Sequence, residues 1–101
     1  MEYGLSEETL ARIVDVLRAY PSVRKAILYG SRAKGNFKHG SDIDITLIGN
    51  EINLTILGKI EWELDDLLLP YTFDLSIFHH IDSKELIEHI NRIGKVIYEN
   101  A

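Results

Sequence analysis

The chain has 101 residues, 46% of them hydrophobic, with no cysteine and a net charge of −5 at pH 7. This length favours a single domain over residues 1–101, and the composition excludes a disulfide framework, a thiolate zinc site and a membrane span. The acidic balance disfavours direct binding to free nucleic acid, which usually needs a basic face, and we expect a cytoplasmic protein with no membrane partner.

The spacing of apolar and helix-breaking residues predicts alternating helices and strands. Ser6 is a good N-cap for a first helix, and Pro21 ends it. Gly30 stops the first strand, Gly35 breaks the helical turn that follows, and Pro70 stops the longest helix. In chain order the predicted elements are a helix from residue 7, a strand over 26–29, one helical turn over 31–34, a loop over 36–40, a strand over 42–48, a helix over 52–69, a strand over 72–78, a helix capped by Asp82 with Glu85, and a short edge strand over 96–98.

This order of elements predicts an α+β fold, a two-layer α/β arrangement with a small mixed or antiparallel β-sheet covered by helices. The first two strands are too close in the sequence for a full crossover helix between them. We therefore expect a hairpin-like antiparallel or mixed sheet rather than a doubly wound one, with the helices on one face.

The turn after the first strand has the residues that phosphate binding needs. Gly30 lets the backbone turn sharply and approach a ligand closely, and Ser31 can give both its hydroxyl and its N–H to a phosphate oxygen. The helical turn that follows would aim further N–H groups at the same place. Neither the Walker A pattern nor G-x-G-x-x-G is present, and Gly-Ser after a strand is by itself usually only a turn.

Basic residues gather around this turn. Six of the 11 Lys and Arg residues lie between Val16 and Ser41, a stretch without Asp or Glu. They form either a solvated basic edge or a positive rim that attracts phosphates. For Arg32, Lys34 and Lys38, the position next to the turn favours the rim.

Two acidic residues stand together on the second predicted strand. Side chains two residues apart in a strand point to the same face, so Asp42 and Asp44 project together, with Cα atoms roughly 7 Å apart. Carboxylates at that separation can share hard cations such as Mg²⁺, and their repulsion would raise the pKa of one of them when no cation is bound. The alternative is a pair of solvent-facing acids, which is the commoner meaning of an isolated D-x-D.

Asp74 adds a third acid on the third predicted strand. Apolar residues alternate with it, so its side chain faces away from the core, as those of Asp42 and Asp44 do. If the two strands are neighbours, all three acids converge. Two would hold metal ions, and the third would help to hold the metal or take the proton from an acceptor hydroxyl. The alternative is a surface acid at the start of a strand.

The order of these features resembles the polymerase-β-like nucleotidyltransferases, and more closely the minimal nucleotidyltransferase (MNT) family. That order is a strand ending in Gly-Ser, a one-turn helix, a loop, D-x-D on the next strand and an Asp on a third, and it covers nearly the whole chain. The family often has Arg where this chain has Lys34, and Lys keeps the charge but lacks the fork geometry of Arg. The residues that carry the resemblance are Gly30, Ser31, Arg32, Ala33, Gly35, Ser41, Asp42, Asp44 and Asp74.

The resemblance implies a nucleotidyltransferase-like fold and a reaction in which an acceptor hydroxyl attacks the α-phosphorus of a nucleotide and expels pyrophosphate. The substrate would be ATP or another NTP, with two Mg²⁺ ions. The predicted catalytic and metal-binding residues are Asp42, Asp44 and Asp74. The predicted phosphate-binding residues are Gly30, Ser31, Arg32, Lys34 and Ser41.

A chain of this size has no obvious lobe for a second substrate, so we infer that a partner protein brings the acceptor. The resemblance indicates a HEPN-domain toxin with ribonuclease character, held in a hetero-oligomer and neutralised by transfer of AMP, which makes this chain the antitoxin. The alternative is a non-catalytic antitoxin that masks its partner, with a vestigial or nucleotide-sensing site. A nucleic-acid-modifying transferase is a third and weaker hypothesis because the chain is acidic and has no second domain.

Several other residues with functional chemistry have more ordinary interpretations. His79 and His80 are adjacent in the third predicted strand and would face opposite ways, which makes them a poor joint metal site. We expect His39 to be a solvated loop residue and His89 to lie on a helix surface. Trp62 is expected in the core or at a partner interface.

Overall fold

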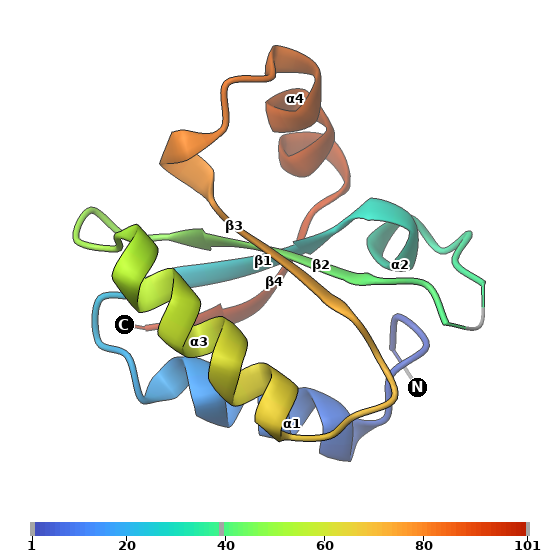
Figure 1. Ribbon diagram of the computed structural model, residues 1–101. Helices are drawn as coiled ribbons and strands as arrows, with labels where there is room; N and C mark the ends of the chain where they lie inside the picture. The colour runs from blue at the N-terminus through green and yellow to red at the C-terminus, as the bar shows by residue number, and fades with distance from the viewer. Residues whose placement is uncertain (1, 39, 101) are drawn as a thin grey trace.

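The computed structural model describes residues 2–38 and 40–100, so His39 lies outside the described residues. A four-stranded sheet forms its centre, with helices above and below (Figure 1). Within the described ranges, no helix has the length and apolar character of a membrane span. The elements are α1 (Glu7–Arg18), β1 (Lys25–Tyr29), α2 (Gly30–Lys34), β2 (Ile43–Ile48), α3 (Leu54–Asp66), β3 (Phe73–Ile77), the 3₁₀ helix η1 (Phe78–His80), α4 (Lys84–Ile93) and β4 (Lys95–Glu99).

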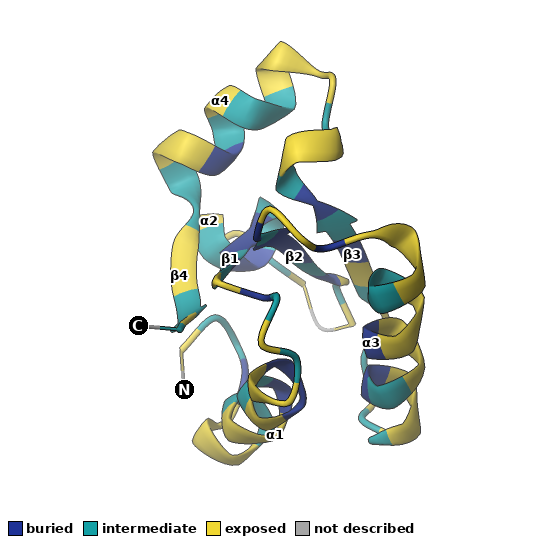
Figure 2. Ribbon diagram, turned by 90° about the vertical axis from the view of Figure 1, so that its left-hand side faces the viewer, coloured by how far each residue is buried: buried dark blue, intermediate teal, exposed yellow. Residues whose placement is uncertain are grey.

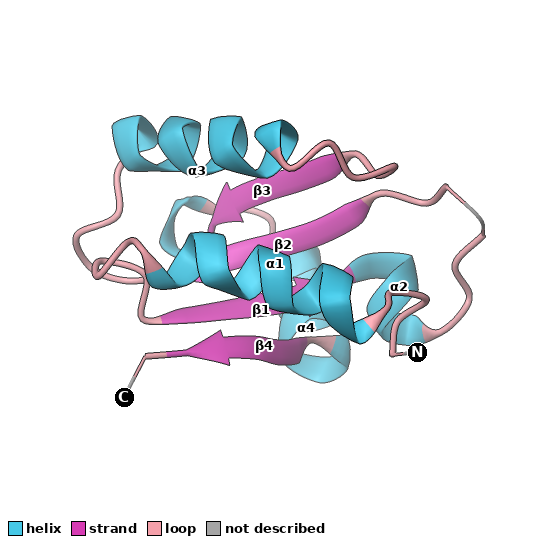
Figure 3. Ribbon diagram, turned by 90° about the horizontal axis from the view of Figure 1, so that it is seen from below, coloured by secondary structure: helices cyan, strands magenta, loops and turns pink. Residues whose placement is uncertain are grey.

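The sheet is mixed, with strand order β3-β2-β1-β4 (Figure 3). β1 pairs antiparallel with β2 and with β4, whereas β2 and β3 run parallel. Parallel neighbours need a crossover connection, and α3 provides it between β2 and β3. The predicted α+β fold with a mixed sheet is confirmed, and so is the predicted edge strand at the end of the chain.

The helices lie on both faces of the sheet, and the prediction that they cover one face is wrong for α4. α1 and α3 pack side by side under the sheet, whereas α4 stands over the opposite face (Figures 1 and 2). That face is not wholly polar, because Ile27 of β1 points to it and packs closely against Gly94 at the end of α4. Ile90 is buried on the same side, which gives the apolar stripe of α4 a place to pack.

The main hydrophobic core lies between the sheet and the α1–α3 layer. The strands send alternate residues into it, as a period of two requires. In β2 the side chains of Ile43, Ile45 and Leu47 are fully buried there, so Asp44 and Thr46 face the other way. The other buried members of this core are Leu5, Ile13, Val16, Leu17, Val23, Ala26, Leu28, Ile52, Ile60, Leu64, Leu75 and Ile77.

The ends of two helices differ from the prediction because of their caps. α3 begins at Leu54, where the Asn53 side chain accepts a hydrogen bond from the Ile56 N–H, so the helix is shorter than residues 52–69. α4 is capped by Ser83 rather than by Asp82, since the Ser83 hydroxyl accepts from the Leu86 N–H.

The third strand ends at Ile77, one residue earlier than predicted, and the chain turns there into η1. His79 and His80 therefore do not alternate as strand residues. Their rings lie 4.7 Å apart, centroid to centroid, in an edge-on arrangement. Both are exposed, so the predicted opposite orientation is wrong although the predicted surface position at the strand end is correct.

The outer side of α3 exposes large apolar side chains. Trp62 is 75% exposed and Leu54 is 70% exposed, and Leu68 just beyond the helix is 86% exposed. Of the two alternatives for Trp62, a core position is therefore wrong, and a position at a partner interface stays a prediction. α3 covers the face of the sheet opposite to α4, so this apolar strip is remote from the polar face described next (Figure 2).

Candidate active site

Three residues form a row across the face of the sheet that α1 and α3 leave uncovered. Tyr29 of β1 is directly opposite Asp44 of β2, and Asp44 is directly opposite Asp74 of β3. Asp42 is exposed one residue before β2 begins, and its charge acts on Asp44. The three predicted acids are therefore gathered at one end of the sheet, as the alternation of the two strands required.

The Asp44 carboxyl has an unfavourable environment for its own negative charge. Burial, reinforced by the charges of Asp74 and Asp42, raises its pKa to about 6 from an ordinary value of 3.8. The charge of Arg32 opposes this rise without cancelling it. The prediction that one of the clustered acids has a raised pKa is thus confirmed for Asp44, and a bound cation would lower that pKa again.

Gly30 brings the backbone against this carboxyl. It has a φ of +77°, and a Cβ atom at this position would collide with Oδ2 of Asp44. Only glycine permits both the left-handed conformation and this close approach. α2 begins at the same residue and ends at Lys34, and Gly35 caps it with a φ of +94°, so the predicted turn and its glycine break are both present.

His89 is a neighbour of this turn that the sequence analysis assigned to the surface. Its Nε2 accepts a hydrogen bond from the Gly30 N–H at 3.1 Å, and its ring meets the edge of Tyr29 at a centroid distance of 6.2 Å. His89 is half-buried because α4 packs over β1 and α2. Its position after Glu88 in an amphipathic helix carries no signal for this contact, because the sequence does not show which face of the sheet α4 covers.

Arg32 is buried rather than open to a phosphate. Only 2% of it is exposed, and its guanidinium donates to the Ser41 carbonyl through Nε and Nη2 at 3.0 and 2.9 Å. Nη1 donates to the Tyr3 carbonyl at 3.0 Å, and Cζ lies over the rings of Phe37 and Tyr71, at 5.1 and 4.9 Å from their centroids. Arg32 therefore braces the segment that leads into Asp42, and the structure does not support its predicted phosphate contact.

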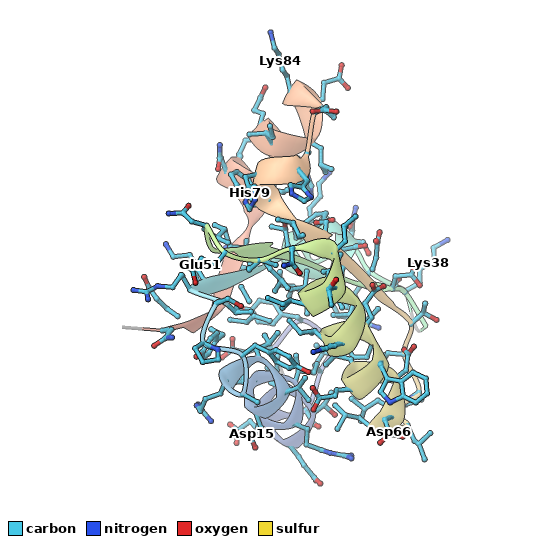
Figure 4. The ribbon with its side chains drawn as sticks, turned by 60° about the vertical axis from the view of Figure 1, so that its left-hand side comes forward. Asp15, Lys38, Glu51, Asp66, His79 and Lys84 are labelled. Atoms are coloured by element: carbon cyan, nitrogen blue, oxygen red, sulfur yellow. The ribbon has the colours of Figure 1, made fainter. Side chains whose placement is uncertain are left out.

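The loop between α2 and β2 is closed by Ser41. The Ser41 hydroxyl accepts from the Lys38 N–H at 2.8 Å, and the Ser41 N–H donates to the Lys38 carbonyl at 2.9 Å. A phosphate bound by the Ser41 hydroxyl would thus have to compete with the hydrogen bond that this hydroxyl accepts from Lys38. Lys34 and Lys38 are exposed, and Figure 4 shows Lys38 extending from this loop into solvent, so they remain candidates for the positive rim.

Replacing the buried guanidinium of Arg32 should destabilise the loop between α2 and β2. An Arg32→Met variant keeps apolar contact with the two rings but leaves the Tyr3 and Ser41 carbonyls without their donors. We expect the free energy of unfolding to fall by about 2–4 kcal/mol in a urea titration. Lys34→Met is the matched control on the same helix, and because Lys34 is exposed its effect should stay within about 0.5 kcal/mol. Equal effects of the two variants would contradict the bracing role.

The row behind the acids is also polar. Thr46 and Ser76 are neighbours across β2 and β3, and among the described residues their buried hydroxyl oxygens have no hydrogen-bond partner. Burial raises the pKa of the Tyr29 phenol, the Ser76 hydroxyl opposes this rise, and the charges of Asp74 and Asp44 add to it. The phenol therefore stays protonated at neutral pH, and this face of the sheet offers hydroxyl groups as well as carboxylates.

The acids suit a metal ion that arrives with its nucleotide. Within residues 2–38 and 40–100, no three His, Asp or Glu side chains are grouped closely enough to form a metal site alone. Mg²⁺ is usually held by one or two carboxylates together with substrate phosphates and water. The carboxylates of Asp42 and Asp44 fit that requirement, because a cation would offset the repulsion that helps to raise the pKa of Asp44. Asp74 lies beside them.

Comparison with known proteins agrees with this arrangement. Residues 11–101 match the family model described as polymerase beta, nucleotidyltransferase. The Methanocaldococcus jannaschii protein named "Putative protein adenylyltransferase MJ1547" is 38% identical over a match of 80 residues that covers 69% of this chain and 66% of that protein. The match thus spans slightly less than two thirds of the relative's length.

Two solved structures share the fold. One is a toxin–antitoxin complex with AMP-PNP, in which the matched chain is 22% identical, with a TM-score of 0.74 over 90% of this chain and 73% of that chain. The other is a tri-AMPylated Shewanella oneidensis HEPN toxin in complex with an MNT antitoxin, 19% identical, with a TM-score of 0.71 over 95% of this chain and 74% of that chain. At these identities the likeness establishes the nucleotidyltransferase-like fold.

Proposed function

The chain belongs to the polymerase β nucleotidyltransferase family, and from that premise we propose that it transfers AMP from ATP to a hydroxyl group of a partner protein. The observation that carries the proposal is the pairing of Asp44 with Asp74 directly beside Gly30. The Gly30 turn, which would bind a phosphate, is then adjacent to the carboxylates that would bind Mg²⁺.

Each part of the site has a role in this reaction. The Gly30 and Ser31 backbone, with the Ser31 hydroxyl, would hold the triphosphate, and Lys34 and Lys38 would draw it in through their charge. Asp42 and Asp44 would hold Mg²⁺, which when bound offsets the negative charge that develops on the phosphates. The acceptor oxygen would form a bond to the α-phosphorus while the bond to pyrophosphate breaks, and Asp74 would take the proton of the hydroxyl.

We propose that the acceptor belongs to a HEPN-domain toxin and that this chain is its antitoxin, acting in the cytoplasm. Support comes from the solved complexes that share the fold, one of them with an AMPylated HEPN toxin, and from the relative named a protein adenylyltransferase.

The test is to incubate the chain with its HEPN partner, Mg²⁺ and each NTP in turn, and to weigh the partner by mass spectrometry. We expect the partner to gain the mass of one or more AMP groups with ATP, and to gain none with Asp42→Asn. Asp66→Asn is the matched control, because Asp66 is an exposed acid on α3, on the other side of the sheet (Figure 4). An unmodified partner whose ribonuclease activity is nevertheless blocked would overturn transfer in favour of masking.

A further inference from the structure

The backbone N–H that the proposed function assigns to the triphosphate already has a partner. The Gly30 N–H, at the start of α2, donates to His89 Nε2 of α4 at 3.1 Å, although the two residues are 59 positions apart in the sequence. The imidazole also makes a T-shaped contact with the Tyr29 ring, at a centroid distance of 6.2 Å. His89 thus lies at the phosphate turn although its helix comes from the far end of the sequence.

This hydrogen bond defines the state of the imidazole. Nε2 must carry a lone pair and no hydrogen in order to accept from an N–H. A phosphate oxygen that accepts from the same N–H would have to approach Nε2 closely, and two acceptors repel each other when they face one donor. The conflict is resolved without moving α4 if Nε2 carries a hydrogen, because the imidazole then donates to the phosphate oxygen.

We propose that His89 is a nucleotide-binding residue that changes from hydrogen-bond acceptor to donor when the triphosphate binds. In the free protein its Nε2 occupies the Gly30 N–H. With nucleotide bound, an oxygen of the triphosphate takes that N–H and receives a second hydrogen bond from Nε2–H. Either the other neutral tautomer or the imidazolium supplies this hydrogen, and the imidazolium would add a favourable charge beside the phosphates. The inference rests on the proposed function, which places the nucleotide at Gly30.

Asp44 and His89 meet Gly30 at different atoms. The Asp44 carboxyl lies against its Cα, and His89 accepts from its N–H. A nucleotide at this turn would therefore meet a carboxylate site for its metal on one side and a donor for its phosphate on the other. The charges of the two sides suit the two parts of a metal–nucleotide complex.

The protonation of Nε2 can be measured directly in the intact chain. With ¹⁵N-labelled imidazole groups, we expect the Nε2 signal of His89 to move from the unprotonated to the protonated range when AMP-PNP and Mg²⁺ are added. His79 and His80 serve as internal controls, since they are exposed on η1 and lack the contact with Gly30. If the Gly30 amide signal shifts on binding while His89 Nε2 stays unprotonated, this inference is overturned and the proposed function stands.

Two substitutions measure the contribution of the donor. His89→Leu removes it, and we expect the dissociation constant for AMP-PNP with Mg²⁺ to rise about tenfold or more, the effect of one lost hydrogen bond to a charged group. His89→Gln keeps an amide N–H and should stay within about threefold of the wild type. Unchanged or tighter binding by His89→Leu would sink the inference. Failure of the wild-type chain to bind AMP-PNP at all would overturn the proposed function with it.

Discussion

A Gly30→Ala variant should lose AMP transfer by at least about a hundredfold, the scale expected when a reacting group is displaced by about an ångström. The new methyl group would collide with Asp44 Oδ2, so either the carboxyl or the turn must move. The variant should also unfold more easily, because a residue with a Cβ at a φ of +77° costs about 1–2 kcal/mol. Transfer rates and urea titrations measure the two effects separately.

Gly35→Ala is the matched control for this variant. Gly35 also has a positive φ, of +94°, but no atom lies within 4 Å of where its Cβ would be. Both variants therefore carry the cost of a Cβ at a positive φ, but only Gly30→Ala collides with Asp44. We expect a similar loss of stability with a much smaller loss of transfer. Equal losses of transfer in the two variants would show that the turn matters through its backbone conformation alone.

The parts of the site that follow from local sequence could be predicted, because they need only the period of a strand and the properties of glycine. Asp42, Asp44 and Asp74 were expected on one face from alternation alone, and Gly30 was expected where the backbone approaches a ligand. The strand pairing that makes Asp44 and Asp74 direct neighbours was only a condition in that argument, since a short sequence pattern does not fix which strands are adjacent.

The parts that the sequence could not supply depend on tertiary packing. Arginine is seldom fully buried, so a basic residue beside a phosphate turn is ordinarily expected to face the ligand. Arg32 is instead buried against a carbonyl and a ring, those of Tyr3 and Tyr71, that come from distant segments. His89 was misplaced for the same reason, because its contact with Gly30 exists only when α4 crosses to the acid face of the sheet.

An Asp44→Asn variant should lose transfer and gain stability at the same time. We expect transfer to fall at least about a hundredfold, because the amide cannot replace the charge of a metal-binding carboxylate. The folded chain, however, raises the pKa of Asp44 to about 6 because its ionised form is unfavourable there. Removing that charge should therefore raise the melting temperature at pH 7 by a few degrees, given about 4–8 °C per kcal/mol for a small domain.

The pH dependence of this gain has a definite sign. A carboxyl whose pKa is higher in the folded than in the unfolded chain stabilises the fold below about pH 4, and this contribution is lost as the pH rises through about 6. The advantage of Asp44→Asn over the wild type should thus grow between pH 4 and pH 6 and level off above pH 7. Melting curves without metal, with Asp66→Asn as control, measure it. A difference that is constant with pH would contradict the raised pKa.

The parallel pairing of β2 with β3 determines when the binding site forms during folding. Asp44 and Asp74 become neighbours only after the chain between them, including all of α3, has closed into a crossover, so the site depends on one of the long-range contacts that form slowly in folding. β3 is also an edge strand, whose opening would expose its backbone to other chains. A metal–nucleotide complex held at Asp44, with the acceptor hydroxyl against Asp74, would oppose that opening, so substrate binding would also protect the chain from edge-to-edge association.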